Sequence, residues 1–398
     1  MTPGGRGGAV IRVTSLDATG PGTLDEALNQ PGPRIIVFEV GGVIDLNRRT
    51  LTIRHPYVTI AAQTAPDPGV TLIRGGVRVK THDVVIRHLM VRPGNAGQAP
   101  RSGWETDGIV AEGPDAHNII VDHCSLTWAT DENLSASGPR FGADAGSSSG
   151  DVSAWRAGTA HRITFSNNII AEGLSNATHS KGEHSKGSLI HDNVRDVLIV
   201  GNLYANNRER NPLLKGGTSA AVVNNLICNP GRRFLHYNLH AGEWGDHAFQ
   251  AGEMSVVGNV FRAGPGTPAT SAAIALGGDG PLDLFAVDNL LEGPSAPRVF
   301  DRFGAGTAPL RELDVPAVWP DGLNRLPASA VAQAVLASVG ARPWARDPID
   351  ARLVAEARDG GGKVIDSQDE VGGYPSYTPT RRQFDPDAWT PDAFEPIR

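Results

Sequence analysis

The sequence predicts an all-β protein folded as a right-handed parallel β-helix, and three observations favour that solenoid. Short runs of β-branched residues recur along the chain at intervals of 23 to 45 residues, which is typical of repeat architectures. No amphipathic helix separates the units, which excludes ankyrin, tetratricopeptide and leucine-rich arrays. The units also vary in length and lack a regular blade motif, so a β-propeller is disfavoured. Most runs end at an Asn or His before another apolar residue, at positions 88, 123, 168, 202, 225, 259 and 289.

The composition agrees with a packed, turn-rich protein. The 398 residues include 48 glycines and 29 prolines, which is too many for a helical bundle. The formal net charge of −7 lacks the basic footprint of a nucleic-acid binder. No apolar stretch is long enough to span a bilayer, so no membrane partner is expected. The two cysteines, Cys124 and Cys228, are expected to be buried thiols, and the protein is expected to be a monomer.

The recurring Asn residues predict an internal ladder. An amide at the same place in successive coils can hydrogen-bond to its neighbours, so that the chain turns a tight corner without leaving buried polar groups unpaired. We therefore interpret the Asn residues as structural, and His88 and His123 as ladder or corner residues and not as metal ligands.

A solenoid needs capped ends, and the sequence offers both. Residues 23–29 predict a short N-terminal capping helix with a capping box between Thr23 and Glu26. Residues 328–339 and 349–357 predict two amphipathic helices, and the tail from Gly360 is Pro- and aromatic-rich. We expect a β-helix with its cap over residues 1–320, and C-terminal helices and tail over 321–398 that pack on it within one domain.

A group of acids follows one of the predicted strands. Asp122 ends an apolar run, and Asp131 and Glu132 follow nine and ten residues later. In a β-helix this short interval is expected to bring two strands of one coil side by side at a corner. Clustered carboxylates suit a hard cation such as Ca²⁺. The alternative is a set of solvated surface acids.

Cationic residues lie one and two coils beyond these acids. The run His179-Ser180-Lys181-Gly182 is echoed at 184–187, and Arg208 and Arg210 follow. An anionic sugar could bridge the two regions, held by a cation on one side and by a guanidinium on the other. An ordinary solvated face is the alternative.

The order of these motifs resembles the pectate lyases of polysaccharide lyase family 1. Val121-Asp122-His123, the Asp131 motif, His184-Ser185-Lys186 and Arg210-Asn211-Pro212 are similar to the Asp-His strand, calcium-binding acids, substrate lysine and catalytic Arg-x-Pro of that family. The opening 4–8 and the stretch 365–373 also resemble a bacterial branch of these lyases. The resemblance covers essentially the whole chain.

This resemblance implies a role for each motif. Asp122 and Asp131 would be calcium ligands, and Ser135 stands where the family commonly has a second acid, so Glu132 or the substrate would complete the site. Arg210 would remove the C5 proton of the sugar. The residues expected to bind substrate are Lys186, or Lys181 in its place, with Arg208 and Lys215 at subsites.

The implied reaction is calcium-assisted β-elimination on polygalacturonate, in a secreted or periplasmic enzyme. Arginine normally stays protonated, so either Arg210 acts as the base under alkaline conditions, or it stabilises charge while another group takes the proton. A lyase acting on another uronate or on methyl-esterified pectin, and a non-enzymatic glycan-binding β-helix, remain alternatives. A hydrolase is disfavoured, since it needs a close trio of acids and the sequence has no second acid pair near Asp122 beyond Asp131 and Glu132.

Overall fold

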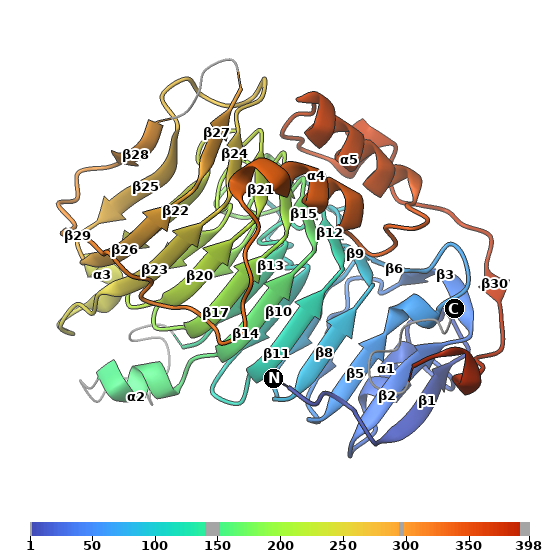
Figure 1. Cartoon of the computed structure of the whole chain (residues 1–398). Coiled ribbons are helices and arrows are strands. Elements are labelled where there is room, and N and C mark those ends of the chain that lie inside the picture. The colour runs from blue at the N-terminus through green and yellow to red at the C-terminus, as the bar shows by residue number, and fades with distance from the viewer. Residues whose placement is uncertain (1, 140–151, 294–297, 391–398) are drawn as a thin grey trace.

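The chain winds into a parallel β-helix, which confirms the predicted fold class (Figure 1). The structure is a computed structural model and describes residues 2–139, 152–293 and 298–390. Within them the strands form three long sheets, and each full coil adds one strand to each sheet in turn. All strand pairs are parallel except that of β3 with β30.

The first sheet has eleven strands. It contains β1 (Ala9–Val13), β2 (Arg34–Phe38), β5 (Val58–Ala61), β8 (Val84–Arg87), β11 (His117–Asp122), β14 (His161–Ser166), β17 (Arg195–Val200), β20 (Ser219–Val223), β23 (Gly252–Val257), β26 (Leu282–Val287) and β29 (Leu310–Glu312).

The second sheet has ten strands. It contains β3 (Val40–Asp45), β6 (Val70–Ile73), β9 (Met90–Arg92), β12 (Ser125–Thr127), β15 (Ile169–Ala171), β18 (Leu203–Ala205), β21 (Leu226–Cys228), β24 (Val260–Arg262), β27 (Leu290–Glu292) and β30 (Thr380–Arg381).

The third sheet has nine strands. It contains β4 (Leu51–Ile53), β7 (Val77–Val79), β10 (Ile109–Glu112), β13 (Leu134–Ser137), β16 (Leu189–Ile190), β19 (Leu213–Lys215), β22 (Leu235–Leu239), β25 (Ala272–Gly278) and β28 (Arg298–Arg302).

The core runs along the axis of the solenoid. Residues in register on neighbouring strands point inward and stack coil upon coil, as Ile86, Val121, Phe165, Ile199 and Val222 do in the first sheet. None of these five side chains is exposed. The alternation of strand residues therefore fixes which side chains remain outside to form sites.

The predicted asparagine ladder is present and fully buried over most of its length. The amide Nδ2 of Asn168, Asn202 and Asn225 each donates to Oδ1 of the next member at 2.9 Å, and Asn259 donates to Asn289 at 3.1 Å. The ladder therefore satisfies the polar groups of one corner in five successive coils.

His88 and His123 belong to the corner and not to the ladder. The register pairs Asp122 with Ser166, so His123 matches Asn167, one place before the ladder. Both histidines adopt a left-handed backbone, with φ of 59° and 50°, and their rings stack at 5.1 Å. The corner thus begins with a left-handed residue and continues with the ladder position.

Loss of one ladder amide is expected to destabilise the fold. Asn225 is fully buried, donates to Asn259 and to the carbonyl of Ile199, and accepts from two nitrogens of Asn202. Asn225→Ala leaves these partners unpaired, and we expect it to lower the free energy of unfolding by about 2 kcal/mol. Denaturant unfolding measures this, with the exposed Asn324→Ala as control. Equal stability of the two variants would contradict a structural ladder.

Over the described ranges of the chain, five helices decorate the solenoid: α1 (Leu24–Leu28), α2 (Val152–Ala157), α3 (Ala241–Trp244), α4 (Ala328–Ser338) and α5 (Pro348–Asp359). Three short 3₁₀ turns also occur: η1 (Ala62–Thr64), η2 (Gln368–Val371) and η3 (Pro386–Ala388). The expected cap is α1, where the Thr23 hydroxyl accepts from the backbone of Glu26, although the Glu26 carboxylate accepts from Gly22 and not from Thr23. Both predicted C-terminal helices are confirmed as α4 and α5. None of the described helices is long and apolar enough to cross a membrane.

The C-terminal segment packs along the ten-stranded sheet. Val331 and Leu353 join the apolar cluster formed by Ile169 and Leu203 of that sheet. The buried guanidinium of Arg92 on β9 is paired with Asp347 and Asp350 at 2.5 and 2.9 Å. Residues 391–398, the end of the expected C-terminal extension, lie outside the described residues. Cys124 and Cys228 are free and buried, as expected.

Candidate functional site

The candidate site lies at the corner where the chain enters the nine-stranded sheet. Glu132, Lys186 and Glu209 occupy equivalent places in successive coils and are joined by parallel bridges. Asp131 precedes Glu132, and Arg210 follows Glu209. The β-helix therefore brings acidic and basic residues from three coils into one row, just before β13, β16 and β19.

Three carboxylates converge at this corner. One oxygen from each of Asp107, Asp131 and Glu132 lies within 4.8 Å of the others, and the backbone of Glu132 donates to Asp107 at 3.0 Å. Burial, with the charge of Asp131 beside it, raises the pKa of Asp107 well above its usual value. Carboxylates gathered in this way repel one another, and a bound cation would relieve that repulsion.

Asp107 was not predicted from the sequence. It lies in the connection before β10, which carries no repeat motif. One signal could have found it, because Asp107 precedes Asp131 by 24 residues, close to the shortest interval between repeat units. Residues separated by one coil stack at the same corner.

Two histidines adjoin the acids. Nε2 of His184 lies 2.9 Å from Oδ1 of Asp131, and Nε2 of His179 lies 3.7 Å from the same oxygen. The two rings stack with centroids 3.7 Å apart. Burial alone would raise the pKa of Asp131, but the hydrogen bond and charge of His184 hold it below its usual value. These three residues form a second group that could hold a metal ion.

The basic residues of the row are paired with acids. The Arg210 guanidinium contacts the Glu132 carboxylate, and the Lys186 ammonium contacts Glu209. Burial lowers the pKa of both Arg210 and Lys186, while neighbouring carboxylates oppose the shift. A lowered pKa favours the neutral form of Arg210, and only the neutral form can accept a proton.

A cavity of about 230 Å³ opens over the row. It gathers five of the predicted site residues, namely Asp131, Glu132, Lys181, Arg210 and Lys215. Lys215 also lies 3.3 Å from Asp192 and contacts Glu243. The cavity is therefore lined by both carboxylates and cations, and Arg210 and Lys215 each contact a carboxylate there.

Two predicted substrate residues are placed differently. Lys186 lies in the row, but its ammonium turns to Glu209, which also accepts from Arg233 at 2.6 Å. Arg208 forms an ion pair with Glu183 at 2.6 Å and is not among the residues that line the cavity. Neither ion pair involves the three converging carboxylates.

Asp122 does not join the other predicted metal ligands. It ends β11 in the eleven-stranded sheet, and it belongs to neither group of described residues that could hold an ion. Its carboxylate accepts from Ser166 at 2.7 Å, Asn167 at 3.0 Å and Arg87 at 3.2 Å. Burial would raise the pKa of Asp122, but its bonds to His123, Asn167 and Ser166 hold it far below the usual value.

The reason for this separation is topological. Only eight residues lie between Asp122 and Asp131, but they contain the whole of β12 and a corner on each side of it. The expectation that this interval brings the two acids to one corner is therefore wrong. The acid that shares a corner with Asp131 comes from the preceding coil.

Known proteins resemble the chain over most of its length. Proteins named probable pectate lyase C are 31% identical to it, over 385 residues in Aspergillus flavus and 387 in Aspergillus terreus; each match covers 93% of this chain and 78% of the relative. No family model matches.

Solved structures show the same fold. Jun a 1, the major allergen from cedar pollen, superposes with a TM-score of 0.52 at 16% identity and covers 85% of this chain and 90% of its own. A variant of Bacillus subtilis pectate lyase gives 0.50 at 14% identity, with 85% and 94% covered. At 16% and 14% identity these two structures establish the fold alone. The 31% identity to the fungal relatives establishes the family, and the chain belongs to the pectate lyase family of polysaccharide lyases.

Proposed function

We propose that the protein cleaves α-1,4-linked polygalacturonate by calcium-assisted β-elimination and releases 4,5-unsaturated oligogalacturonides. The observation that carries the proposal is one cavity lined by Arg210, Asp131 and Glu132, with the Arg210 guanidinium against Glu132 and a carboxylate oxygen of Asp107 within 4.8 Å of those of the two acids. A polymeric substrate of this kind is met outside the cytoplasm, so a secreted or periplasmic location is part of the proposal. A monomeric state is also part of it.

The donor set supports calcium as the cation. Ca²⁺ takes oxygen ligands and tolerates irregular geometry, and three carboxylate oxygens within 4.8 Å of one another provide such ligands. Asp107 and Asp131 would hold the ion, with Glu132 contributing the oxygen that does not contact Arg210. When bound, calcium would attract the substrate carboxylate and neutralise negative charge that develops on it.

The residues of the chain supply the remaining chemistry. Lys181 and Lys215 line the cavity and would bind the uronate carboxylate as cations. Loss of the proton from C5 leaves an electron pair that forms the C4–C5 double bond as the bond from C4 to the glycosidic oxygen breaks. Arg210 would either take this proton, a role favoured because burial lowers its pKa, or stay protonated and stabilise the charge left behind.

Product analysis tests the proposal. The unsaturated uronide absorbs ultraviolet light, so its absorbance should rise on polygalacturonate, fall with chelator and return with added Ca²⁺. Methyl-esterified pectin and alginate serve as comparison substrates. A methyl ester lacks the negative charge with which a carboxylate would bind the metal, and alginate carries a different uronate. No unsaturated product on any of the three would contradict a lyase, and equal rates on esterified pectin would contradict the proposed substrate.

Glu132 is expected to position Arg210 more than it binds metal. Because its Oε1 contacts the guanidinium, Glu132→Gln should lower turnover about 10-fold, at the weak end of the loss from an orienting contact. The Ca²⁺ concentration for half-maximal activity should rise less than in Asp131→Asn. Steady-state kinetics across Ca²⁺ concentrations measure both. Glu183→Gln, which alters the matching ion pair of Arg208 outside the cavity, is the control. A shift in Ca²⁺ requirement without loss of turnover would contradict this role.

A further inference from the structure

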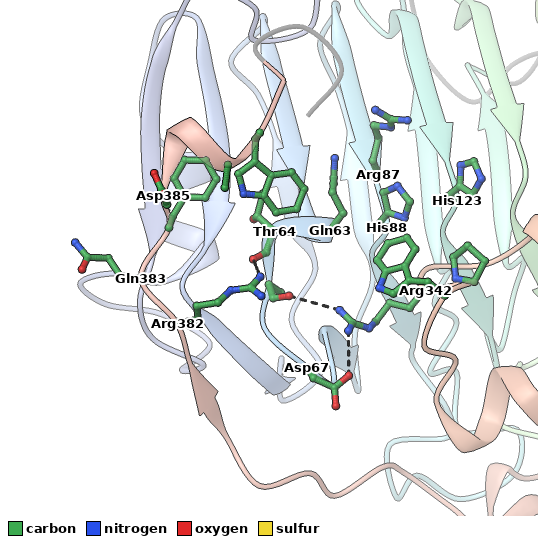
Figure 2. Close-up of a pocket in the computed structure, with 16 residues that line it drawn as sticks. Gln63, Thr64, Asp67, Arg87, His88, His123, Arg342, Arg382, Gln383 and Asp385 are labelled. Carbon is green, nitrogen blue, oxygen red and sulfur yellow. Dashed lines mark hydrogen bonds and ion pairs between the residues drawn. The ribbon is translucent and has the colours of Figure 1, made fainter. Parts of the chain in front are cut away.

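A larger cavity lies at a different corner of the solenoid. It measures about 870 Å³ and is bounded by the first coils of the eleven-stranded sheet and by two C-terminal segments. Figure 2 shows Arg87, Arg342 and Arg382 around it, each from a different segment of the chain. Among the described residues, this cavity and the one beside Asp131 have no lining residue in common. We call it the tail groove, defined by Arg87, Arg342, Trp344, Arg382 and Trp389.

The wall made by the tail is firmly attached. Phe384 is buried against Ile35, Val37 and Ala61 on the outside of the eleven-stranded sheet. The backbone of Arg382 donates to the carbonyl of Glu39, and its guanidinium donates to the carbonyl of Thr64, each at 2.9 Å. The groove is therefore formed in the folded chain, and a ligand would not have to order it.

Aromatic side chains of the groove are accessible. Trp344 is 58% exposed, whereas Trp128, Trp155 and Trp244 are fully buried in the interior. Its indole lies 5.2 Å from the ring of His88 and 5.6 Å from the Arg342 guanidinium, measured to ring centroids. An exposed indole held in this way offers a flat, amphipathic face to a ligand.

The guanidinium groups retain donors for a ligand. Arg342 donates to Asp67 at 3.0 Å from one terminal nitrogen and to the carbonyl of Ala65 at 3.5 Å from the other, so each terminal nitrogen keeps one N–H group. Asp67 is itself 79% exposed, so water screens this pair. Arg382 is exposed, and its hydrogen bond to the Thr64 carbonyl uses one of its five N–H groups. Asp122 holds Arg87 through Nε at 3.2 Å, which gives this acid a role at the groove.

We infer that the tail groove is a second, non-catalytic binding site for an acidic oligosaccharide. Planar guanidinium groups match carboxylates in pairs, and the amphipathic indole suits the apolar face of a sugar ring, so the combination fits a chain of uronic acids better than a neutral glycan or a peptide. The choice of galacturonate as the sugar rests on the proposed function. The groove and the candidate site lie at different corners of the solenoid. A polymer bound in the groove would therefore stay near the enzyme, and the local concentration of substrate at the candidate site would rise.

Calorimetric titration with trigalacturonate in the presence of chelator tests the inference. Chelator removes the metal-dependent part of binding at the carboxylate cluster and stops turnover, so a loss of the remaining binding in tail-groove variants reports on the groove. The unaltered protein should bind one equivalent. Trp344→Ala and Arg382→Gln should each weaken this binding at least tenfold, whereas Phe249→Ala and Arg49→Gln, at an exposed aromatic and an exposed arginine elsewhere, should leave it unchanged.

The possible outcomes separate this inference from the proposed function. No binding in chelator, or binding that all four variants retain, would overturn the tail groove even if the protein is an active lyase. Equal affinity for galactotriose, the neutral counterpart, would overturn the assignment to acidic sugars. Conversely, a protein that makes no unsaturated product but loses trigalacturonate binding in Trp344→Ala would keep the groove and lose the proposed reaction.

Discussion

Arg210→Lys is expected to lower turnover on polygalacturonate by at least ~10²-fold, equivalent to about 2.7 kcal/mol of transition-state stabilisation. Lysine keeps the positive charge but loses the planar fork that contacts Glu132. A primary ammonium is also a compact charge on a flexible stem, so it would not reproduce the placement of two N–H groups toward one reacting centre. The loss should approach that of Arg210→Ala.

The backbone at Arg210 makes this substitution a fair comparison. Its φ of 64° lies in the left-handed region, which is uncommon for residues other than glycine and is found more often at functional sites. Lysine and arginine meet the same backbone cost there because both have a Cβ. A change in turnover is then due to the head group and not to relaxation of the chain.

The Michaelis constant should change much less than turnover. The ground-state carboxylate is expected to be held by Lys181, Lys215 and the metal, none of which is altered. Initial rates over a range of polygalacturonate concentrations at alkaline pH measure both quantities. Arg208→Lys, whose ion pair with Glu183 lies outside the cavity, should remain close to the unaltered enzyme. If Arg210→Lys retains near-normal turnover, Arg210 has no part in the chemistry.

The sequence predicts the repeating part of this fold well because each coil carries its own copy of the pattern. Inward β-branched residues and the Asn corner recur from Asn168 to Asn289, so an error in one unit does not alter the interpretation of the others. The caps are also local, since Thr23 and the amphipathic patterns of α4 and α5 need no distant partner to be recognised.

The site is less predictable because it depends on which corner each acid occupies. A count of residues between Asp122 and Asp131 does not show that a strand of the ten-stranded sheet lies between them. Asp107 was missed since it sits in a non-repeating connection. The tail groove is still harder to predict from local sequence patterns, because it depends on contacts between distant segments. His88 and Ala341, for example, form a hydrogen bond although 253 positions separate them in the chain.

Asp131→Asn is expected to raise the Ca²⁺ concentration for half-maximal activity by at least ~10-fold, and chelator is expected to abolish activity of the unaltered enzyme. Asp131 belongs to both groups of described residues that could hold an ion, so its charge is central to either arrangement. Asparagine keeps the size and one oxygen of the side chain. The fold should therefore survive while the attraction for a dication falls.

Asp122→Asn is the matched control, and it decides between the two arrangements of acids. Asp122 is the same residue type and is mostly buried, but its oxygens already accept from Ser166, Asn167 and Arg87 at another corner. Its loss should reduce stability without altering the Ca²⁺ requirement. Activity after dialysis against chelator, followed by Ca²⁺ titration, separates these effects when thermal unfolding is measured on the same samples.

Should Asp122→Asn raise the Ca²⁺ requirement as strongly as Asp131→Asn, the metal would be bound by the pair that the sequence first suggested, and Asp107 would lose its assignment as a ligand. An unchanged Ca²⁺ requirement in Asp131→Asn would instead contradict a metal site at this corner, because Asp131 belongs to both candidate groups and the loss of its charge should weaken cation binding in either.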